Sequence, residues 1–151
     1  MDIFTRQKRS EIMAKVSSKD TKPEIIVRKF LFARGFRFRK NVKNLPGKPD
    51  IVLRKYKTII FINGCFWHGH TCKRAGLPKN NHSFWEEKIT KNKTRDIENI
   101  RILEEMGWHV MTVWQCELLN ITQRENKLEE IVNLLHYFKN CLLYTSDAAD
   151  E

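Results

Sequence analysis

Ten consecutive residues, NGCFWHGHTC from Asn63 to Cys72, contain two thiols and two imidazoles, which are side chains that bind zinc. A loop carrying Cys65, His70 and Cys72 can wrap a tetrahedral ion if Cys116, at the end of a later strand, completes the set. We therefore expect a closed Cys3His zinc site, which is structural because no coordination position is left for water. Plain burial of apolar cysteines is the alternative, and it explains Cys116 better than the three ligands within eight residues.

His68 lies in the same loop, between Trp67 and Gly69, and is left free by that zinc set. We expect it to carry acid–base chemistry, because an imidazole exchanges protons near neutral pH. The competing interpretation is that His68 is itself a zinc ligand.

Asp50 begins an apolar, strand-like segment after Pro49, and it stands alone among cations that we expect to keep it ionised. An ionised carboxylate suits a hard cation such as magnesium. Its strand should pair with the next one, which ends at Ile62 and Asn63, so a magnesium ion at Asp50 would also reach a backbone carbonyl near Ile62 and lie close to His68. The alternative is that Asp50 only caps the preceding turn or pairs with a lysine.

Glu24 follows Thr21 and Pro23 in a helix-start pattern, with Thr21 as the N-cap residue and Glu24 as the acid of a capping box. From the first helix Glu24 could also reach the edge of the sheet that carries Asp50. There it would orient a metal-bound water or an imidazole. The two roles are compatible.

Phe66 and Trp67 lie too close to the expected zinc ligands for both to point into one core, so at least one should be exposed. With Trp85, at the start of a long helical segment, they could form an aromatic wedge that stacks between bases. The alternative for Trp85 is a hydrophobic staple at the helix start. Trp108 and Trp114 alternate with small residues in a strand and are interpreted as core.

Periodicity predicts one α/β domain with a mixed central β-sheet flanked by helices, in the order α-β-β-β-α-β-α. The first helix should bury Ile25, Val27, Phe30 and Leu31, and two β-branched runs should form a hairpin inside the sheet. The expected elements are a helix from 21 to about 33, strands at 36–39, 50–53 and 58–62, a helix at 84–106, a strand at 108–114 and a helix at 127–138.

Charge and composition point to a nucleic-acid partner. The 151-residue chain has a formal net charge of +10, and residues 25–57 hold eleven lysines and arginines against the single acid Asp50. Such density favours a polyanion, because each neutralised phosphate releases counterions. A solvated basic face is the alternative. The chain has no apolar run long enough for a membrane and no signal segment, so we expect a cytoplasmic monomer with reduced cysteines.

The C-terminal end differs in character from what precedes it. Residues 141–151, CLLYTSDAADE, are small and acidic and resemble the translation of an adapter read-through. The expected organisation is therefore an N-terminal segment at 1–20, a domain at 21–140 and a non-native tail at 141–151.

Nearly all of residues 6–138 resembles the very short patch repair DNA mismatch endonucleases, relatives of the PD-(D/E)xK nucleases. The motifs that carry the resemblance are RSEIMAKVSSKDTKPE, LPGKPDIV, FINGCFWHGHTC, FWEEKITKN and LEEMGWHVMTVWQCEL, in this order.

This resemblance implies an enzyme that nicks double-stranded DNA 5′ to the thymine of a T:G mismatch, using magnesium, expected as two ions. It makes Asp50 the magnesium ligand and His68 the acid–base residue, with Glu24 in support. Some members of the family have a second histidine where this chain has Asn63, which can bind water or phosphate but cannot shuttle a proton at neutral pH. The lysine of the wider superfamily is also missing after Ile60.

The resemblance also implies a restriction-endonuclease-like fold and roles outside the chemistry. It makes residues 1–20 a segment that contacts DNA, with Met13 approaching the duplex from the other groove, and it admits mismatch-repair proteins as partners. Cys65, His70, Cys72 and Cys116 become the structural zinc site, and Phe66, Trp67 and Trp85 the intercalating wedge.

Three other functions compete with this one. A restriction-type nuclease without mismatch specificity would use the same scaffold and cut matched DNA equally fast. A non-catalytic zinc-containing DNA-binding module would use Asp50 and Glu24 only as caps. A zinc hydrolase is disfavoured because the four-ligand set leaves no vacancy for water.

Overall fold

The computed structural model describes residues 21–72 and 75–149, with side chains described up to Cys141. The expected DNA-contacting segment, residues 1–20, lies outside the described residues, and so does Met13.

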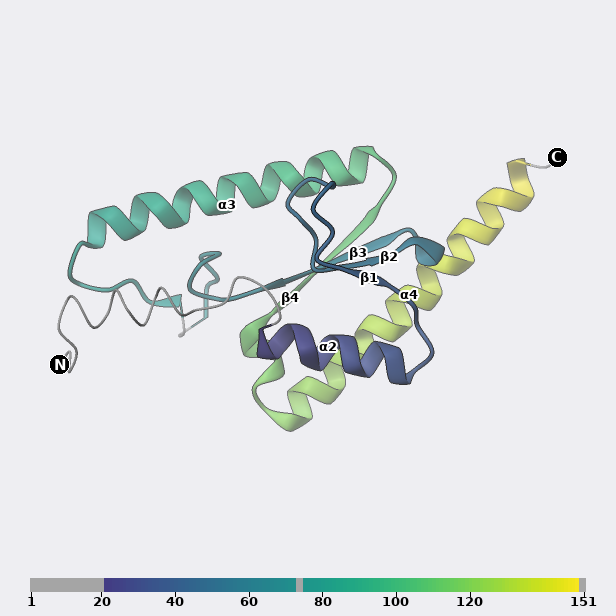
Figure 1. Ribbon diagram of the computed structural model, residues 1–151, viewed down its shortest axis with the longest axis horizontal. Coiled ribbons are helices and arrows are strands. Elements are labelled where there is room, and N and C mark those ends of the chain that lie inside the picture. Colours follow the sequence, from purple (N-terminus) through teal and green to yellow (C-terminus); the bar gives the residue numbers. More distant parts are fainter. Residues whose placement is uncertain (1–20, 73–74, 150–151) are drawn as a thin grey trace.

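A four-stranded mixed sheet of order β1-β2-β3-β4 forms the centre of the domain (Figure 1). The antiparallel pairs are β1–β2 and β2–β3, and the last pair, β3–β4, is parallel. A parallel pair needs a long crossover, which the helix α3 (His82–Glu105) provides. The expected hairpin is confirmed as β2 and β3 joined by the 3-10 turn η1 (Arg54–Tyr56). The strands are β1 (Arg39–Lys40), β2 (Ile51–Leu53), β3 (Thr58–Asn63) and β4 (His109–Trp114).

Helices cover both faces of this sheet, as the expected single α/β domain requires (Figure 1). The helices α2 (Lys22–Ala33) and α4 (Ile121–Ala149) lie on one face, and α3 lies on the other. A short 3-10 turn, η3 (Gln115–Leu118), links β4 to α4.

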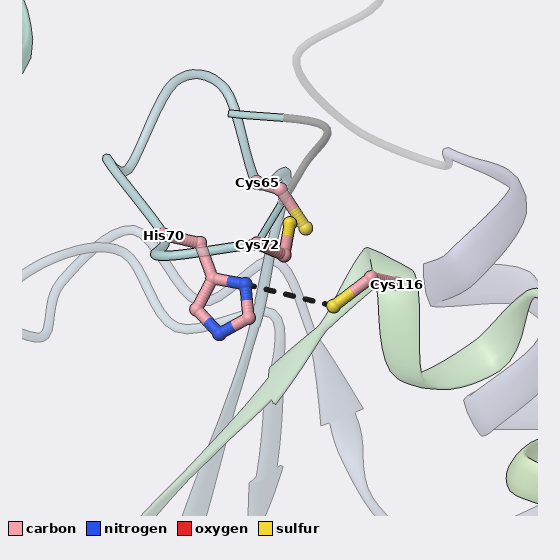
Figure 2. Close-up of side chains that lie close together, drawn as sticks. All are labelled: Cys65, His70, Cys72 and Cys116. Atoms are coloured by element: carbon pink, nitrogen blue, oxygen red, sulfur yellow. Dashed lines mark hydrogen bonds between the residues drawn. The ribbon is translucent and has the colours of Figure 1, made fainter. Parts of the chain in front are cut away.

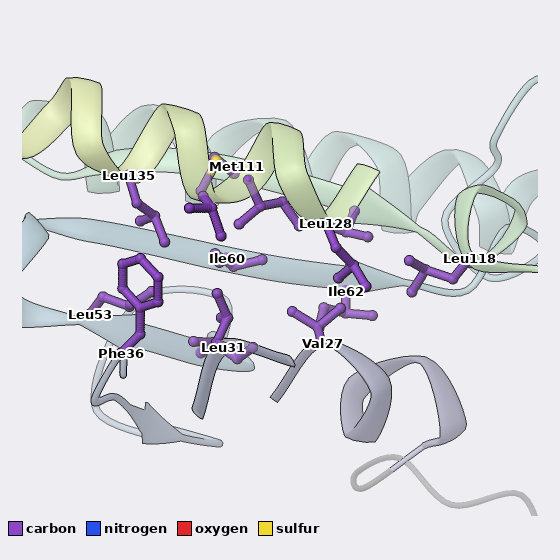
Figure 3. Packing of buried hydrophobic residues seen from close by; sticks show 14 residues of the cluster. Val27, Leu31, Phe36, Leu53, Ile60, Ile62, Met111, Leu118, Leu128 and Leu135 are labelled. Carbon is purple, nitrogen blue, oxygen red and sulfur yellow. The ribbon is translucent and has the colours of Figure 1, made fainter. Parts of the chain in front are cut away.

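The larger core lies between the sheet and the pair α2 and α4 (Figure 3). Alternate residues of β2, β3 and β4 point into it, including Ile51 and Leu53 of β2 and Ile60 and Ile62 of β3, whereas Val52 and Ile59 join the smaller core under α3. This two-residue alternation is the pleat of a sheet that is buried on both faces, and each fully buried aliphatic side chain contributes about 1.5–3 kcal/mol. From the helices, the larger core receives Val27, Leu31, Leu128, Ile131, Val132 and Leu135.

The first helix differs from its expected form at two positions. Val27 and Leu31 are buried and Phe30 packs against the core, but Ile25 is 39% exposed and faces away from it. Thr21 is the N-cap residue, yet its side chain makes no capping hydrogen bond, so the expected capping box is wrong. Glu24 is instead buried, with its Oε2 atom 3.5 Å from Nη2 of Arg28.

Three further sequence expectations need correction: the length of the first strand, the bounds of the last helix and the burial of two tryptophans. The strand expected at 36–39 is the two-residue β1, although Phe36 and Phe38 do contact the core. The last helix starts at Ile121 and continues into the expected tail. Trp108 and Trp114 are only half-buried, with Trp108 under the Lys57 ammonium group at 4.2 Å and Trp114 stacked on His70.

Candidate active site and metal centre

The parallel pairing of β3 and β4 brings several candidate residues to one edge of the sheet. Asn63 pairs with Trp114 at the strand ends, so the segments that follow, NGCFWHGHTC and QCEL, leave the sheet side by side. Asp50, just before antiparallel β2, lies at the same edge. A cavity of about 800 Å³ opens there, lined by Glu24, Lys48, Asp50, Ile62, Asn63, Trp67, His68, Lys88, Asn92, Arg95 and Asp96 among others. The four expected catalytic residues therefore face one space.

Asp50 is held by the next strand and is partly buried. Its Oδ2 atom accepts a hydrogen bond from the backbone N–H of Ile62 at 2.7 Å. Burial, with a smaller contribution from the nearby Glu24, raises the pKa of Asp50 from 3.8 to about 6, even though the Ile62 N–H, His68 and Arg28 each lower it. Loss of water therefore outweighs the surrounding cations, so Asp50 is ionised at neutral pH but has a raised pKa rather than a lowered one.

The neighbouring carboxylate of Glu24 is 3% exposed, and Arg28 lies one helical turn further along α2. Two carboxyl groups that share a poorly solvated cavity favour a cation between or beside them. Ile62 presents its N–H toward Asp50, and in a β-strand the carbonyl of a residue points to the same side as its N–H. Both features fit a hard divalent cation held by oxygen atoms, as expected for magnesium.

His68 is oriented by a residue that the sequence did not single out. Its Nδ1 atom lies 2.5 Å from Oδ2 of Asp96, which projects from α3. A carboxylate can only accept, so Nδ1 carries the proton and Nε2 is the nitrogen left for chemistry. Asn92, one turn earlier on α3, donates from Nδ2 to the Trp67 carbonyl at 2.9 Å and ties the loop to the helix.

A sequence signal for Asp96 and Asn92 does exist. Both fall on the stripe of α3, spaced by three or four residues, that joins Ile89 to Leu103, which are the two buried residues of this helix. Polar residues within a buried stripe need partners, and a site at the opposing loop supplies them.

The four predicted zinc ligands come together at the strand ends (Figure 2). One ligand atom from each of Cys65, His70, Cys72 and Cys116 lies within 4.8 Å of all the others. The Nδ1 atom of His70 points at the Cys116 sulfur, 3.5 Å away, and the His70 ring stacks on Trp114 with centroids 4.1 Å apart. This spacing and donor set fit a tetrahedral zinc ion.

The thiols of this cluster are held in their neutral form when no cation is present. Burial raises the pKa of Cys65, and burial together with the neighbouring thiols raises the pKa of Cys116 to about 12. A divalent ion reverses this preference, because metal binding requires thiolates and releases their protons. The cluster therefore suits a metal ion better than it suits three free thiols.

The three expected wedge residues form one aromatic cluster beside the cavity. The ring centroids of Phe66, Trp67 and Trp85 are 5.1, 5.4 and 5.8 Å apart in the three pairs, all edge-on. Each ring is half-buried, and none belongs to either core. Phe84, which the sequence reading missed, lies next to Trp85 and is 57% exposed. Trp85 thus joins the loop aromatics, as the wedge interpretation requires.

The loop that carries these residues is pressed against α3. Gly69 has a φ of +63°, and a Cβ atom there would lie 2.6 Å from Cδ of Lys93 and 2.7 Å from Cγ2 of Ile89. Only glycine fits both the conformation and the space. The close contact fixes the loop between Cys65 and Cys72 relative to Asp96.

Comparison with known proteins places this site in a family. Residues 1–74 match the profile of the DNA mismatch endonuclease Vsr. The chain is 57% identical over 131 residues to the type II nicking enzyme V.NmeAIP of Neisseria meningitidis, covering 87% of this chain and 94% of the relative. It is 40% identical over 117 residues to the DNA mismatch endonuclease Vsr of Escherichia coli, covering 78% of this chain and 75% of the relative. The chain belongs to the Vsr family.

Membership of the Vsr family makes the chain an endonuclease and confirms the family resemblance of its motifs. The non-catalytic DNA-binding module is thereby excluded. A third Vsr-like relative, the type II nicking enzyme V.XorIIP of Xanthomonas oryzae, is 42% identical over 132 residues, covering 87% of this chain and 97% of the relative. Within the described residues, no helix combines the length and apolar character needed to cross a bilayer.

Proposed function

We propose that the protein nicks double-stranded DNA 5′ to the thymine of T:G mismatches, by magnesium-dependent hydrolysis, in very short patch mismatch repair. The observation that carries the proposal is the single cavity onto which Asp50, Glu24 and the Asp96-bound His68 all face, beside the aromatic cluster. Membership of the Vsr family supports DNA as the substrate.

Asp50 is the proposed protein ligand of magnesium, with the Ile62 carbonyl as a second oxygen donor. When bound, magnesium would lower the pKa of water and neutralise charge on the phosphate. Glu24 would accept hydrogen bonds from water in this shell, because its carboxylate is fixed by α2 and by Arg28. Asn63, 9% exposed at the end of β3, would hold water or a phosphate oxygen through its amide.

His68 is the proposed acid–base residue. With its Nδ1 proton directed at Asp96, its Nε2 atom can take a proton from the attacking water or deliver one to the leaving 3′ oxygen. Asp96 would stabilise the imidazolium that forms, so we assign it a positioning role that the sequence reading did not contain.

Phe66, Trp67 and Trp85 are the proposed wedge that selects the mismatch. A T:G wobble pair costs less to unstack than a matched pair, so inserting aromatic rings into the duplex favours mismatched sites. Stacking of one base on an aromatic ring is worth about 1–3 kcal/mol. Met13 would approach from the other groove. The zinc ion of the Cys65 cluster would hold the wedge loop rigid and would take no part in catalysis.

We propose that the chain works on DNA as a monomer in the cytoplasm, with mismatch-repair proteins as possible partners. The basic residues between 25 and 57 support a DNA partner through phosphate neutralisation. The assignment of residues 141–151 as a non-native tail also stays a proposal.

The central experiment uses end-labelled duplexes that carry a T:G or a matched T:A pair in one sequence, incubated with and without magnesium. We expect one break, 5′ to the mismatched thymine, that requires magnesium. Asp50→Ala should abolish nicking while DNA binding persists. Equal cutting of matched DNA would favour a restriction-type nuclease, and cleavage by the Asp50→Ala variant would place the active site elsewhere.

The wedge can be tested separately with 2-aminopurine next to the mismatch, because this base fluoresces more strongly when it is unstacked. Binding of the unmodified protein should raise the fluorescence, and Trp85→Ala should raise it much less. Tyr137→Ala, which removes an exposed ring from α4, is the matched control. An undiminished signal with Trp85→Ala would exclude Trp85 from the wedge.

A further inference from the structure

Three bases line the active-site cavity, and they differ in how they are held. The Lys88 ammonium group lies over the Trp67 ring at 5.7 Å, and the Arg95 guanidinium donates to Asn92 at 2.6 Å. Lys48 is exposed at the cavity wall, and its side chain makes no ion pair or hydrogen bond to any residue of 21–72 or 75–141. Its charge is therefore not neutralised by that part of the chain.

The backbone of Lys48 is in a conformation that lysine seldom adopts. Its φ is +49°, in the left-handed region, which is unfavourable for a residue with a Cβ atom. The Lys48 N–H closes a turn onto the Leu45 carbonyl at 3.0 Å. Glycine or asparagine would fill this position at lower cost. The protein thus tolerates strain here for a side chain that packs against nothing buried.

A second lysine of the chain shows that such a backbone conformation can place the ammonium group against a partner. Lys57 is the other left-handed lysine of the described residues, with a φ of +50°, and its ammonium group lies 4.2 Å from the centre of the Trp108 ring. Lys48 has no such ring contact. The described residues therefore offer the Lys48 ammonium group no partner of this kind.

The loop that bears Lys48 cannot move away from the cavity without repacking. Gly47 has a φ of +77°, and a Cβ atom there would lie 3.0 Å from Cζ of Phe61 and 3.2 Å from Cβ of Asn99. The turn is thus pressed between β3 and α3. Asp50 follows Lys48 by two residues, so the lysine and the carboxylate line the cavity from one rigid segment.

The two carboxylates in the cavity make a positively charged side chain favourable on the cavity wall. Asp50 and Glu24 both repel an approaching phosphodiester, and Arg28, with a side chain only 11% exposed, is directed to Glu24 from the interior. A cation on the cavity wall would offset this repulsion where the substrate arrives.

We propose that Lys48 binds a non-bridging oxygen of the scissile phosphate and stabilises the charge that develops there during hydrolysis. This inference rests on the proposed nicking function. It adds a catalytic residue that contacts the substrate, in a turn that is held between β3 and α3.

The test compares single-turnover nicking of the T:G duplex, at saturating DNA and magnesium, by the unmodified protein and by Lys48→Gln, Lys48→Gly and Lys48→Arg. Removing one preorganised cation or donor from a transition-state site costs about 100-fold in rate, which is the loss expected for the first two variants. Lys48→Arg should stay within about fivefold, because it keeps the charge. Lys139→Gln, which removes a lysine from α4 outside both the cavity lining and the basic stretch 25–57, is the charge-matched control and should nick normally.

Lys48→Gly separates a chemical role from a structural one. Glycine accepts a φ of +49° without strain, so its melting temperature should equal or exceed that of the unmodified protein while nicking falls. Normal rates for Lys48→Gln and Lys48→Gly at saturating DNA would overturn the proposal, and so would weakened binding with no loss of rate. If the unmodified protein fails to nick, the proposed function fails instead, and the two failures are distinguishable.

Discussion

Among single residues, Asp50 carries the sharpest conflict between folding and chemistry. Magnesium binding needs its carboxylate ionised, yet burial in the cavity raises its pKa to about 6. In the metal-free protein this ionised group costs folding free energy, and the same group is the proposed ligand. Active sites commonly hold such groups, which is why substitutions that remove activity can raise stability.

The pH dependence of stability follows from this shift. Below pH 3.8 the carboxyl is neutral in both the folded and unfolded chain, and above pH 6 the folded chain bears the full cost of ionising it. Without added magnesium, Asp50→Asn should therefore raise the free energy of unfolding at pH 7.5 by up to about 3 kcal/mol and change it little at pH 4. The asparagine can still accept from the Ile62 N–H. Urea unfolding at both pH values measures this, and an equal effect at the two values would contradict the assigned cause.

The pairing of His68 with Asp96 gives a second prediction at this scale. Asp96→Asn keeps the size of the side chain but removes the charge that orients the imidazole, so the nicking rate should fall by about 100-fold. The pH–rate profile of this variant should also change shape, which a purely structural defect would not cause. Glu98→Gln, on the same helix but paired with Arg101 at the surface, is the control. An unchanged rate for Asp96→Asn would remove Asp96 from the site.

Among the structural elements, the loop from Asn63 to Cys72 depends on contacts at both of its ends. Cys65 and Cys72 meet Cys116 beyond β4, and the middle of the loop is held by Asn92 of α3. The loop has no secondary structure longer than a turn, so these side-chain contacts hold it in place where a helix or strand would use backbone hydrogen bonds. The position of His68 is therefore set by distant residues, since Asn92 lies 25 residues after Trp67 and Asp96 lies 28 residues after His68.

Metal removal tests this dependence. We expect about one zinc per chain in the purified protein, and Cys72→Ser should lose it and melt at a lower temperature, because a structural zinc ion contributes folding free energy. Cys141→Ser, outside the cluster, should retain both zinc and stability. Zinc content by mass spectrometry and calorimetry provide the two measurements. An unchanged melting temperature for Cys72→Ser would argue that the cluster binds no metal.

How much the sequence predicted depends on how local each signal is. The hairpin of β2 and β3 and the four clustered zinc-type ligands were predictable, because β-branched runs and ligand spacing are written in short segments. Asp96 was missed because its partner lies 28 residues away on another element. The capping box failed because burial beside Arg28 and Asp50 outweighs a local hydrogen bond for Glu24. The length of β1 was not predictable, since an edge strand is limited by what pairs with it.

At the scale of the whole molecule, charge distribution sets how the enzyme meets its substrate. A formal charge of +10 on 151 residues creates a field that attracts DNA of any sequence. Specificity must then come from the cavity and the aromatic cluster. Binding affinity and mismatch discrimination should respond differently to salt.

A salt titration tests whether binding affinity and mismatch discrimination depend differently on ionic strength. If the protein neutralises about six phosphates, affinity should fall about 1,000-fold between 50 and 200 mM salt. The ratio of affinities for T:G and matched duplexes should change far less, because base stacking releases few counterions. Fluorescence anisotropy with both duplexes measures both quantities. A ratio that collapses with salt would indicate that discrimination itself is electrostatic.

The parallel pairing of β3 with β4 has a consequence for the enzyme during its synthesis on the ribosome. A nascent chain that has emerged only as far as residue 105 already carries Asp50, His68 and Asp96. At that point β3 still lacks its parallel partner β4, and the metal-binding cluster still lacks its fourth ligand, Cys116. Translation of the next dozen residues supplies both at once. The nuclease thus becomes competent late, after nearly all of its cutting machinery has been made.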